Sequence, residues 1–292
     1  MADDRLVIEP EFREAHAAAG LDSVESLADP ALGETVVSSS TTRTARVVLD
    51  RRGGGPVLWV KTYRYPTWRH RFRGAFRTTF GARGRAASEW ANLALMPEFG
   101  FGRVRRAALG ERRVAGFLAL AVLATEEIEG ALGLDAWLAR ESKSSDRQRA
   151  ALRTRTVLDI LAGAVARMHR EGGFIDRNLD RRNILVAQPR PGGFVLYNID
   201  SPRGRVVRGH AAFEKGWRED LARLDVTSDR LLGLKSRARF LKTYLGPAAS
   251  GWRRTAAEIV AAEAKFARRA AARFEESVKG HASDLDEDKS RV

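Results

Sequence analysis

A charged stretch enclosed by two apolar segments constrains this chain more than any other part of the sequence. Residues Asp176 to Asn183 read Asp-Arg-Asn-Leu-Asp-Arg-Arg-Asn. Before them, Leu152 to His169 carries apolar residues at helical spacing and is followed by glycines, which favours an amphipathic helix with a glycine stop. After them, Ile184 to Ala187 and Phe194 to Ile199 flank a turn rich in Pro and Gly, so they predict a β-hairpin. We therefore expect a charged loop held between a long helix and a hairpin that runs into Asp200.

The composition fits one large or two modest domains with a hydrophobic core. The chain has 292 residues, of which 44% are apolar and 30% are charged. It contains no cysteine, which excludes disulfides and thiolate metal sites. The N-terminus is acidic and lacks the apolar core of a signal peptide, and the longest apolar run, Val114 to Ala124, is too short to cross a bilayer. These features predict a cytoplasmic protein.

The charge is strongly positive and unevenly distributed. Lys and Arg number 51 against 37 Asp and Glu, which gives a net charge of +14. The excess lies at Arg51-Arg52, on later Arg-rich helices and between Lys61 and Arg85, where arginines alternate with aromatic residues. Such a surface attracts phosphates, nucleic acid or an anionic membrane leaflet. An amphipathic helix that buries Phe72 and Phe76 would show the same pattern, so both interpretations stay open.

The first half of the chain predicts a sheet, preceded by an acidic leader with a helix near Glu11 to Ala19. A further helix is expected over Arg83 to Leu95, between the third and fourth strands. Lys61 ends the third strand, and Glu89 on the helix is its natural partner. Five segments predict the strands: Val36-Val37, Ala45 to Leu49, Val57 to Lys61, Val104 to Ala108 and Arg113 to Ala124.

The second half of the chain predicts a mainly helical region, which Thr125 to Ile128 links to the sheet. We expect an N-terminal lobe with the leader and a five-stranded sheet over residues 1–128, a helical lobe over 129–279 and a polar tail over 280–292. Asp220 should face the charged loop. Besides the long helix, further helices are expected at Leu134 to Leu138, Trp217 to Leu224, Leu231 to Tyr244 and Trp252 to Phe274.

The order of these elements, together with the residues of the charged loop, resembles the protein-kinase fold. The kinase catalytic loop has the pattern H-R-D-L-x-x-x-N. When its final Asn is aligned with Asn183, Arg177 and Leu179 match the Arg and Leu of the pattern. Asp200 then falls on the Asp of the D-F-G signature, and Lys61 on the lysine that ends a kinase strand. The resemblance implies an α+β, two-lobed fold with an antiparallel-sheet N-lobe and a mostly helical C-lobe.

Among kinases, the chain most resembles the lipopolysaccharide core kinases, which phosphorylate heptose or Kdo of the inner core. The resemblance covers residues 30–245 and rests on several segments together. It implies an ATP- and Mg²⁺-dependent phosphotransferase that acts on a sugar hydroxyl of a glycolipid. The cues are the basic aromatic segment after Lys61, the Arg-rich approach to Glu89-Trp90, the hinge Glu126-Glu127-Ile128, the loop Asp-Arg-Arg-Asn-Ile-Leu and the segment Ile-Asp-Ser-Pro-Arg-Gly.

The resemblance also implies a role for each residue of a nucleotide site. A lysine fixed by a glutamate holds the phosphates, and two oxygen ligands bind Mg²⁺. A hinge meets the adenine through its backbone, and a Ser/Thr-rich turn stands where kinases carry a glycine-rich loop, although an ordinary polar hairpin would look the same. On this sequence the nucleotide-binding residues are Lys61, Glu89, Glu126, Ile128, Ser39 and Ser40, and the metal ligands are Asn183 and Asp200.

Two positions of the catalytic loop depart from the kinase pattern. Asp176 stands at the His position, and Asn178 stands where the resemblance implies the Asp that accepts the proton of the acceptor hydroxyl. An amide is nearly isosteric with a carboxylate but cannot act as a base. Three explanations stay open: an engineered substitution that traps a complex, a natural pseudokinase that binds nucleotide or scaffolds a partner, or a takeover of the base role by Asp180 or Asp176.

Other functions share some of these features. A nucleotide-binding pseudokinase or regulatory scaffold would keep the fold without turnover. A basic nucleic-acid-binding protein would explain the charge but neither Lys61 with Glu89 nor Asn183 with Asp200, so nucleic acid is not the expected partner. A small-molecule kinase of the aminoglycoside or choline type shares the fold. With a glycolipid acceptor, the Arg64 to Arg85 segment would place the protein at the inner membrane face.

Overall fold

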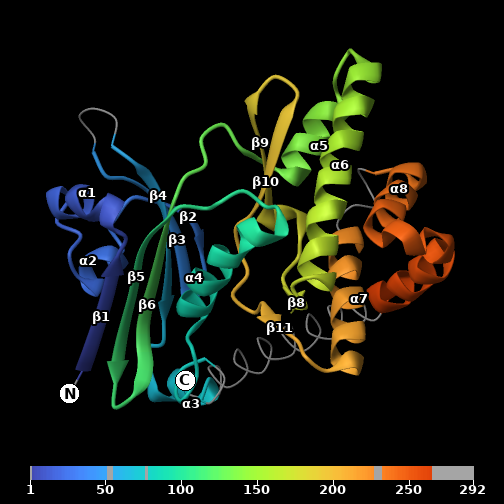
Figure 1. Cartoon of the computed structure of the whole chain (residues 1–292). Coiled ribbons are helices and arrows are strands. Elements are labelled where there is room, and N and C mark those ends of the chain that lie inside the picture. Colours follow the sequence, from blue (N-terminus) through green and yellow to red (C-terminus); the bar gives the residue numbers. More distant parts are fainter. Residues whose placement is uncertain (1, 51–54, 76–77, 227–231, 265–292) are drawn as a thin grey trace, which may run out of the picture.

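A sheet region lies beside a helical region in the computed structural model, which describes residues 2–50, 55–75, 78–226 and 232–264 (Figure 1). The sheet has six antiparallel strands in the order β1-β5-β6-β4-β3-β2. The strands are β1 Ala2–Ile8, β2 Glu34–Ser38, β3 Thr42–Val48, β4 Val57–Arg64, β5 Arg106–Val114 and β6 Phe117–Glu126. The helices of this region are α1 Arg13–Ala18, α2 Val24–Ala28, α3 Trp68–Arg73 and α4 Arg85–Leu95, with 3-10 turns at Pro10–Phe12 and Met96–Phe99.

Different helices cover the two faces of the sheet. Successive side chains of a strand point to opposite faces, so β4 serves both. Leu58 and Val60 pack in a cluster with residues of the leader and α2. Tyr63 is three residues after Val60, so its side chain points to the other face, where it packs in a second cluster with Leu93 of α4. The same alternation places Lys61 on the α4 face, within reach of the helix that the sequence predicted as its partner.

The helical region is built around α6, which begins where the Asp146 side chain accepts the Arg149 N–H at 2.9 Å. The predicted long helix and the predicted hairpin are both present, as α6 and as β9 with β10. The helices are α5 Leu134–Ser142, α6 Arg147–Arg170, α7 His210–Val226, α8 Leu234–Leu245 and a helix from Trp252 that is described to residue 264, with 3-10 turns at Arg181–Asn183 and Gly246–Gly251. The strands are β7 Leu132–Gly133, β8 Phe174–Ile175, β9 Ile184–Arg190, β10 Gly193–Asn198 and β11 Arg205–Val206, in sheets ordered β10-β9-β7 and β11-β8.

The prediction of five strands was wrong, because the acidic leader itself forms the edge strand β1. This strand pairs with β5 from Ala2 opposite Val114 to Ile8 opposite Ala108. Asp4 lies 2.6 Å from Arg112 of β5, so leader carboxylates offset the basic strand beside them. The helix predicted in the leader is present as α1.

The fourth and fifth predicted strands have different bounds in the structure, because a tight turn falls inside the predicted fifth strand. Ala115 and Gly116 join β5 to β6, and both have positive φ angles, 49° and 79°. Two-residue hairpin turns in which both residues have positive φ angles match the right-handed twist of the flanking strands. Ala at a positive φ is uncommon, so Gly116 was the only signal of this turn, and a weak one.

The predictions on Arg51-Arg52, on Phe76 and on the tail over 280–292 lie outside the described residues, as does the part of the predicted last helix beyond residue 264. The helix predicted from Trp217 begins earlier, at His210. Among the helices that the structure describes, none has the length and apolar character needed to cross a membrane.

Candidate active site

Lys61 on β4 lies at the centre of an ionic cluster that joins the sheet to the charged loop region. Its Nζ is 2.6 Å from Glu89 Oε1 on α4 and 2.9 Å from Asp200 Oδ1, which follows β10. The Tyr63 hydroxyl donates to the second carboxylate oxygen of Glu89 at 3.3 Å. The expected pair of Lys61 and Glu89 is therefore formed, and Asp200 is the third member of the cluster.

Burial sets the charge state of this cluster. Glu89 is fully buried, and burial raises its pKa to about 7 against the opposing effect of Lys61. Burial alone would lower the pKa of Lys61, but the carboxylates of Glu89 and Asp200 outweigh it and hold that pKa above its usual value. Lys61 therefore stays protonated at neutral pH, and the 2.6 Å contact favours a charged pair with Glu89. A cation fixed in this way is suited to bind phosphate oxygens.

Asn178 connects the two predicted metal ligands. Its side-chain Nδ2 donates to the main-chain carbonyl of Asp200 at 3.1 Å and also to the Asp200 carboxylate. Its own main-chain carbonyl accepts a hydrogen bond from Asn183 Nδ2 at 2.9 Å. The Ile199 N–H donates to the Asn183 carbonyl at 2.9 Å, which fixes Asn183 beside the chain that leaves β10. The structure thus brings Asn178, Asn183 and Asp200 together.

The oxygen atoms of Asn183 and Asp200 fit a hard cation. Because Asn183 uses its nitrogen toward Asn178, its Oδ1 is left as an oxygen ligand. The Asp200 side chain is 28% exposed, so its carboxylate is accessible although it accepts from Lys61 and Asn178. Mg²⁺ is commonly held by one or two protein oxygens together with phosphate and water oxygens. In the described part of the chain, no cluster of three or more His, Cys, Asp or Glu is arranged for a metal ion.

The two carboxylates that could replace the missing base both brace the loop. Asp176 is fully buried and accepts from Asn198 Nδ2 at 2.6 Å and from the Ser201 hydroxyl at 2.7 Å. Asp180 begins the 3-10 turn and accepts from the N–H and the guanidinium of Arg182 at 3.0 Å. Burial acts to raise the pKa of Asp180, but the hydrogen bonds from Arg182 outweigh it and lower that pKa.

The pH dependence of stability is expected to report on Asp176. Burial and the nearby Asp220 carboxylate raise the pKa of Asp176 from its ordinary 3.8 to about 7, against the hydrogen bonds from Ser201 and Asn198. The folded protein therefore binds this proton more tightly than the unfolded chain, so the stabilising contribution is present at low pH and declines as the pH rises through that window. Asp176→Asn removes the titration, and we expect its free energy of unfolding to fall less steeply than that of the wild type between about pH 5 and pH 7. Urea unfolding at several pH values measures both slopes, and equal slopes contradict the prediction.

A buried network below the loop fixes its backbone. As predicted, Asp220 on α7 faces the loop, and it accepts the main-chain N–H groups of Asp176 at 2.7 Å and Arg177 at 2.8 Å. Arg177 has a φ of 62°, a left-handed conformation that few non-glycine residues adopt. His169 lies 3.4 Å from Asp220, and its other ring nitrogen lies 3.0 Å from the Tyr244 hydroxyl. Nothing in the sequence pairs His169 with Tyr244, which lie on separate helices, α6 and α8.

Asn92 is a further residue that the sequence reasoning missed. It lies on α4, and its Nδ2 donates to the carbonyls of Ser201 at 2.7 Å and Gly204 at 2.9 Å. The only signal was its position three residues after Glu89, which puts both side chains on one face of the helix. Through these two residues α4 contacts both Lys61 and the segment that follows Asp200.

The predicted hinge residues lie where β6 leaves the sheet. Glu126 ends β6 opposite Leu58 and pairs with Arg105 at 2.5 Å. Ile128 packs against the cluster beneath α4. The neighbouring Glu127 binds Arg46 of β3 at 2.5 Å, which ties the connection to the sheet.

The predicted serine turn joins β2 to β3 and lies at the end of the sheet opposite to the hinge. The Ser39 N–H donates to the Thr42 carbonyl at 2.8 Å, and the Ser39 hydroxyl accepts from the Thr42 N–H at 3.1 Å. Ser40 is exposed. Ser39 is thus used to close the turn between β2 and β3.

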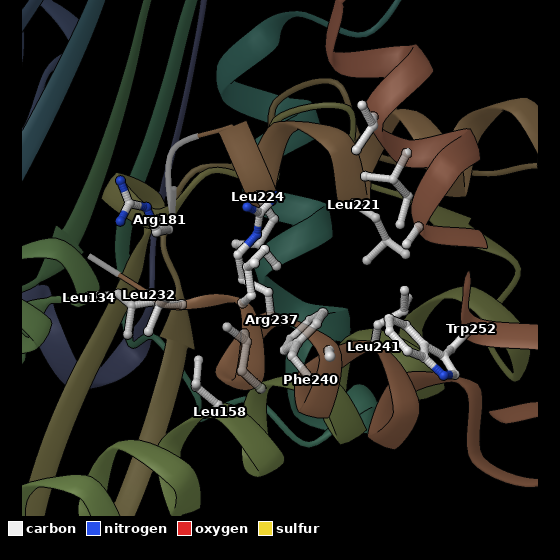
Figure 2. A pocket seen from close by; sticks show the side chains of 16 residues that line it. Leu134, Leu158, Arg181, Leu221, Leu224, Leu232, Arg237, Phe240, Leu241 and Trp252 are labelled. Atoms are coloured by element: carbon white, nitrogen blue, oxygen red, sulfur yellow. The ribbon is translucent and has the colours of Figure 1, made fainter. Parts of the chain in front are cut away.

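A large cavity in the helical region is separate from the ionic cluster. It has a volume of about 350 Å³ and lies among α6, α7, α8 and the helix after Trp252 (Figure 2). Its lining is apolar apart from Arg181 and Arg237, and Arg181 lies 3.0 Å from Asp135. The cavity does not include the Lys61 cluster or the predicted metal ligands.

Comparisons with known proteins agree with this geometry. The solved structure of "WaaP in complex with acyl carrier protein" matches with a TM-score of 0.63 and 23% identity, over 89% of this chain and 97% of that chain. This similarity shows that the chain has the two-lobed, kinase-like fold. No curated protein sequence matches the chain. A model of the lipopolysaccharide kinase (Kdo/WaaP) family matches residues 30–244, and the chain therefore belongs to this family of kinases.

Proposed function

We propose that this chain binds ATP with Mg²⁺ and transfers a phosphoryl group to a sugar hydroxyl of a glycolipid core, with Asn178 limiting the rate. One observation carries the proposal: the ammonium of Lys61 contacts Glu89 of the sheet lobe and Asp200 of the helical lobe at 2.6 Å and 2.9 Å. Glu89 and Asp200, which are far apart in the sequence, thus contact the same ammonium group. Phosphoryl transfer depends mainly on such positioning and charge neutralisation.

Each residue of the cluster has a distinct task in this proposal. Lys61, oriented by Glu89, would bind phosphate oxygens of ATP. Asn183 and Asp200 would hold Mg²⁺, which supplies positive charge against the phosphates when bound. Asn92 and Asp220 would act as positioning residues, since they hold the chain on either side of the site.

The acceptor side is where the proposal departs from an ordinary kinase. The Asn178 amide donates to Asp200 and cannot take a proton from an acceptor hydroxyl. The transition state of phosphoryl transfer has little bond formation to the acceptor, so an amide that orients the hydroxyl is compatible with slow transfer. A base typically contributes about 10²- to 10⁴-fold, which sets the expected loss of rate. A nucleotide-binding pseudokinase is the second candidate, and it differs only in having no transfer at all.

Nucleotide binding should depend on Lys61. Saturating ATP with Mg²⁺ stabilises a binding protein by about 2.7 kcal/mol at a hundredfold excess over Kd, which raises the melting temperature by several degrees. We expect this shift for the wild type and none for Lys61→Met, because the phosphates lose their cation. Differential scanning fluorimetry measures the shift.

The control is Lys143→Met, which removes an exposed lysine after α5 and should keep the nucleotide shift. Since Lys61→Met leaves Glu89 buried without its partner, the double variant Lys61→Met/Glu89→Gln separates lost binding from lost stability. The proposal is wrong if ATP does not stabilise the wild type, or if Lys61→Met retains the full shift.

A further inference from the structure

We propose that an aromatic and arginine surface at one end of the sheet docks this protein on an anionic lipid bilayer. The docking surface consists of Trp68, Arg69, Arg71 and Phe72 of α3 together with Phe117 at the start of β6. The inference extends the proposed function, because a glycolipid acceptor resides in a membrane. The evidence for the docking surface, however, comes from residues that take no part in the ionic cluster around Lys61.

The aromatic side chains of the docking surface form one contiguous cluster, in which Trp68 and Phe72 are exposed. Trp68 is 46% exposed and Phe72 is 60% exposed, and their spacing of four residues places them on one face of α3. Their ring centroids are 5.7 Å apart, and both rings contact Phe117, at 5.7 Å and 4.8 Å. Phe80 also stacks on Phe117, with ring centroids 4.5 Å apart, so Phe117 joins the exposed rings to a further aromatic residue. Large rings exposed together mark an interaction surface more often than isolated ones do.

The charged residues of the segment that carries α3 have a single sign. The 27 residues from Thr62 to Ser88 contain seven arginines and no Asp or Glu. Arg69 and Arg83 are exposed, and neither forms an ion pair with a carboxylate of the described residues. Arg71 donates to the carbonyls of Tyr65 and Pro66, at 2.9 Å and 3.5 Å, and has no ion pair with a carboxylate in the part of the chain that the structure describes. Aromatic rings at the headgroup level with arginines beside them are the pattern of proteins that bind anionic membrane surfaces.

The position of the docking surface suits a reaction at the membrane. Strand pairing puts the Ala115–Gly116 turn and the end of β4 at Arg64 at one end of the sheet, beside α3 (Figure 1). The hinge leaves the opposite end, where Glu126 pairs with Leu58. Lys61 is three residues from Arg64 along β4, a distance of about 10 Å at the rise of a strand. Docking by this end would therefore hold the ionic cluster close to the lipid surface.

The geometry of the rings favours lipid over nucleic acid. Bases stack on the open faces of aromatic rings. One face of Trp68 is covered by the Arg71 guanidinium, which lies 4.9 Å from the ring centroid, and Phe117 meets Trp68 edge to face. Insertion among lipid headgroups needs exposed apolar rings with cations beside them, and the docking surface supplies the exposed rings of Trp68 and Phe72 with Arg69.

The test is binding of the full chain to vesicles without nucleotide, measured by co-sedimentation. One set of vesicles mixes phosphatidylglycerol with phosphatidylcholine, and the other contains phosphatidylcholine alone. We expect the wild type to bind the anionic vesicles and Trp68→Ser/Phe72→Ser to bind at least tenfold more weakly. Removing one arginine, in Arg69→Gln, should weaken binding about fivefold and make it less sensitive to salt.

A matched control is Leu152→Ser, which removes a side chain of α6 that is 61% exposed and should leave vesicle binding unchanged. Tryptophan quenching by lipids brominated near the headgroup gives a second readout, which Trp68→Phe should reduce. Circular dichroism and the ATP-induced thermal shift show whether each variant stays folded, so a failed docking surface can be told from a failed nucleotide site.

Three results would overturn the proposal. The first is equal binding of the wild type and Trp68→Ser/Phe72→Ser to anionic vesicles. The second is no binding of the wild type to those vesicles. The third is salt-sensitive binding of the wild type to a single-stranded oligonucleotide, which Trp68→Ser/Phe72→Ser and Arg69→Gln abolish without changing vesicle binding. This result would assign the surface to nucleic acid.

Discussion

Replacing Asn178 with Asp is expected to raise phosphoryl transfer by about 10²- to 10⁴-fold, the range that a positioned base contributes. Asn178 is held between Asp200 and Asn183 by hydrogen bonds of its side chain and its carbonyl. An Asp side chain of nearly the same shape would place an oxygen where the amide nitrogen now donates. Transfer of labelled phosphate from ATP to a lipopolysaccharide acceptor with heptose or Kdo measures the gain, and ATP hydrolysis is a second readout.

The same substitution should also change the response to Mg²⁺. A carboxylate at position 178 would face the carboxylate of Asp200, and two like charges at close range repel. The variant should therefore be less stable than the wild type without a divalent cation and should gain more stability when Mg²⁺ is added. Thermal unfolding with and without Mg²⁺, in the absence of nucleotide, measures this difference independently of turnover.

Two controls accompany this prediction. Asn178→Ala removes the hydrogen bond to Asp200 without supplying a base, so it should show neither gain. Asn178→Asp/Lys61→Met restores the base but removes the phosphate-binding cation, so it should lose the activity that Asn178→Asp gains. If Asn178→Asp stays inactive while still binding ATP, the loop does not place residue 178 at the acceptor, and the pseudokinase interpretation gains support.

Truncating Asp220 is expected to destabilise the fold by about 3–5 kcal/mol, the usual cost of removing one partner from a buried charged network. Asp220 is fully buried and accepts the N–H groups of Asp176 and Arg177. Asp220→Ala would remove the acceptor of the buried Asp176 N–H and of the partly buried Arg177 N–H, and would release Arg177 from its left-handed conformation. Chemical denaturation measures the loss, and weakened ATP binding should accompany it because the loop also carries Asn178 and Asn183.

The matched control for this loss is Asp159→Ala on α6. Asp159 pairs with Arg239 of α8 at 2.6 Å, but both side chains are substantially exposed, at 31% and 47%. Exposed pairs contribute little, so we expect a loss below about 1 kcal/mol. A similar loss for both variants would mean that Asp220 does not hold the loop.

The parts of the site that the sequence revealed are those fixed by local pattern. Lys61 follows a short apolar run typical of a strand, Glu89 lies on a helix of clear periodicity, and Asn183 and Asp200 stand at either end of a hairpin with a strong turn signal. These patterns carry their own geometry, because strand alternation and helix spacing decide which side chains share a face. The order of the elements then gave the kinase-like fold.

The remaining features depend on contacts between distant segments. The edge strand β1 pairs with β5 across about a hundred residues, and its Asp4 meets Arg112 there, which no local window of sequence contains. Asp176 illustrates the same limit, since its sequence position suggested a replacement base while its burial against Asn198 and Ser201 gives it a bracing contact. Side-chain burial of this kind is set by tertiary packing and not by spacing along the chain.

The tie between Asn92 and the carbonyls of Ser201 and Gly204 has a consequence for regulation. In many kinases, control comes from swinging the helix that carries the glutamate away from its lysine and from a long activation loop that orders on phosphorylation. Here α7 begins only ten residues after Asp200, and outward movement of α4 would break both hydrogen bonds and leave the Asn92 amide unsatisfied. If the proposed reaction holds, we expect its rate to be governed by delivery of the acceptor and not by an on–off movement of α4.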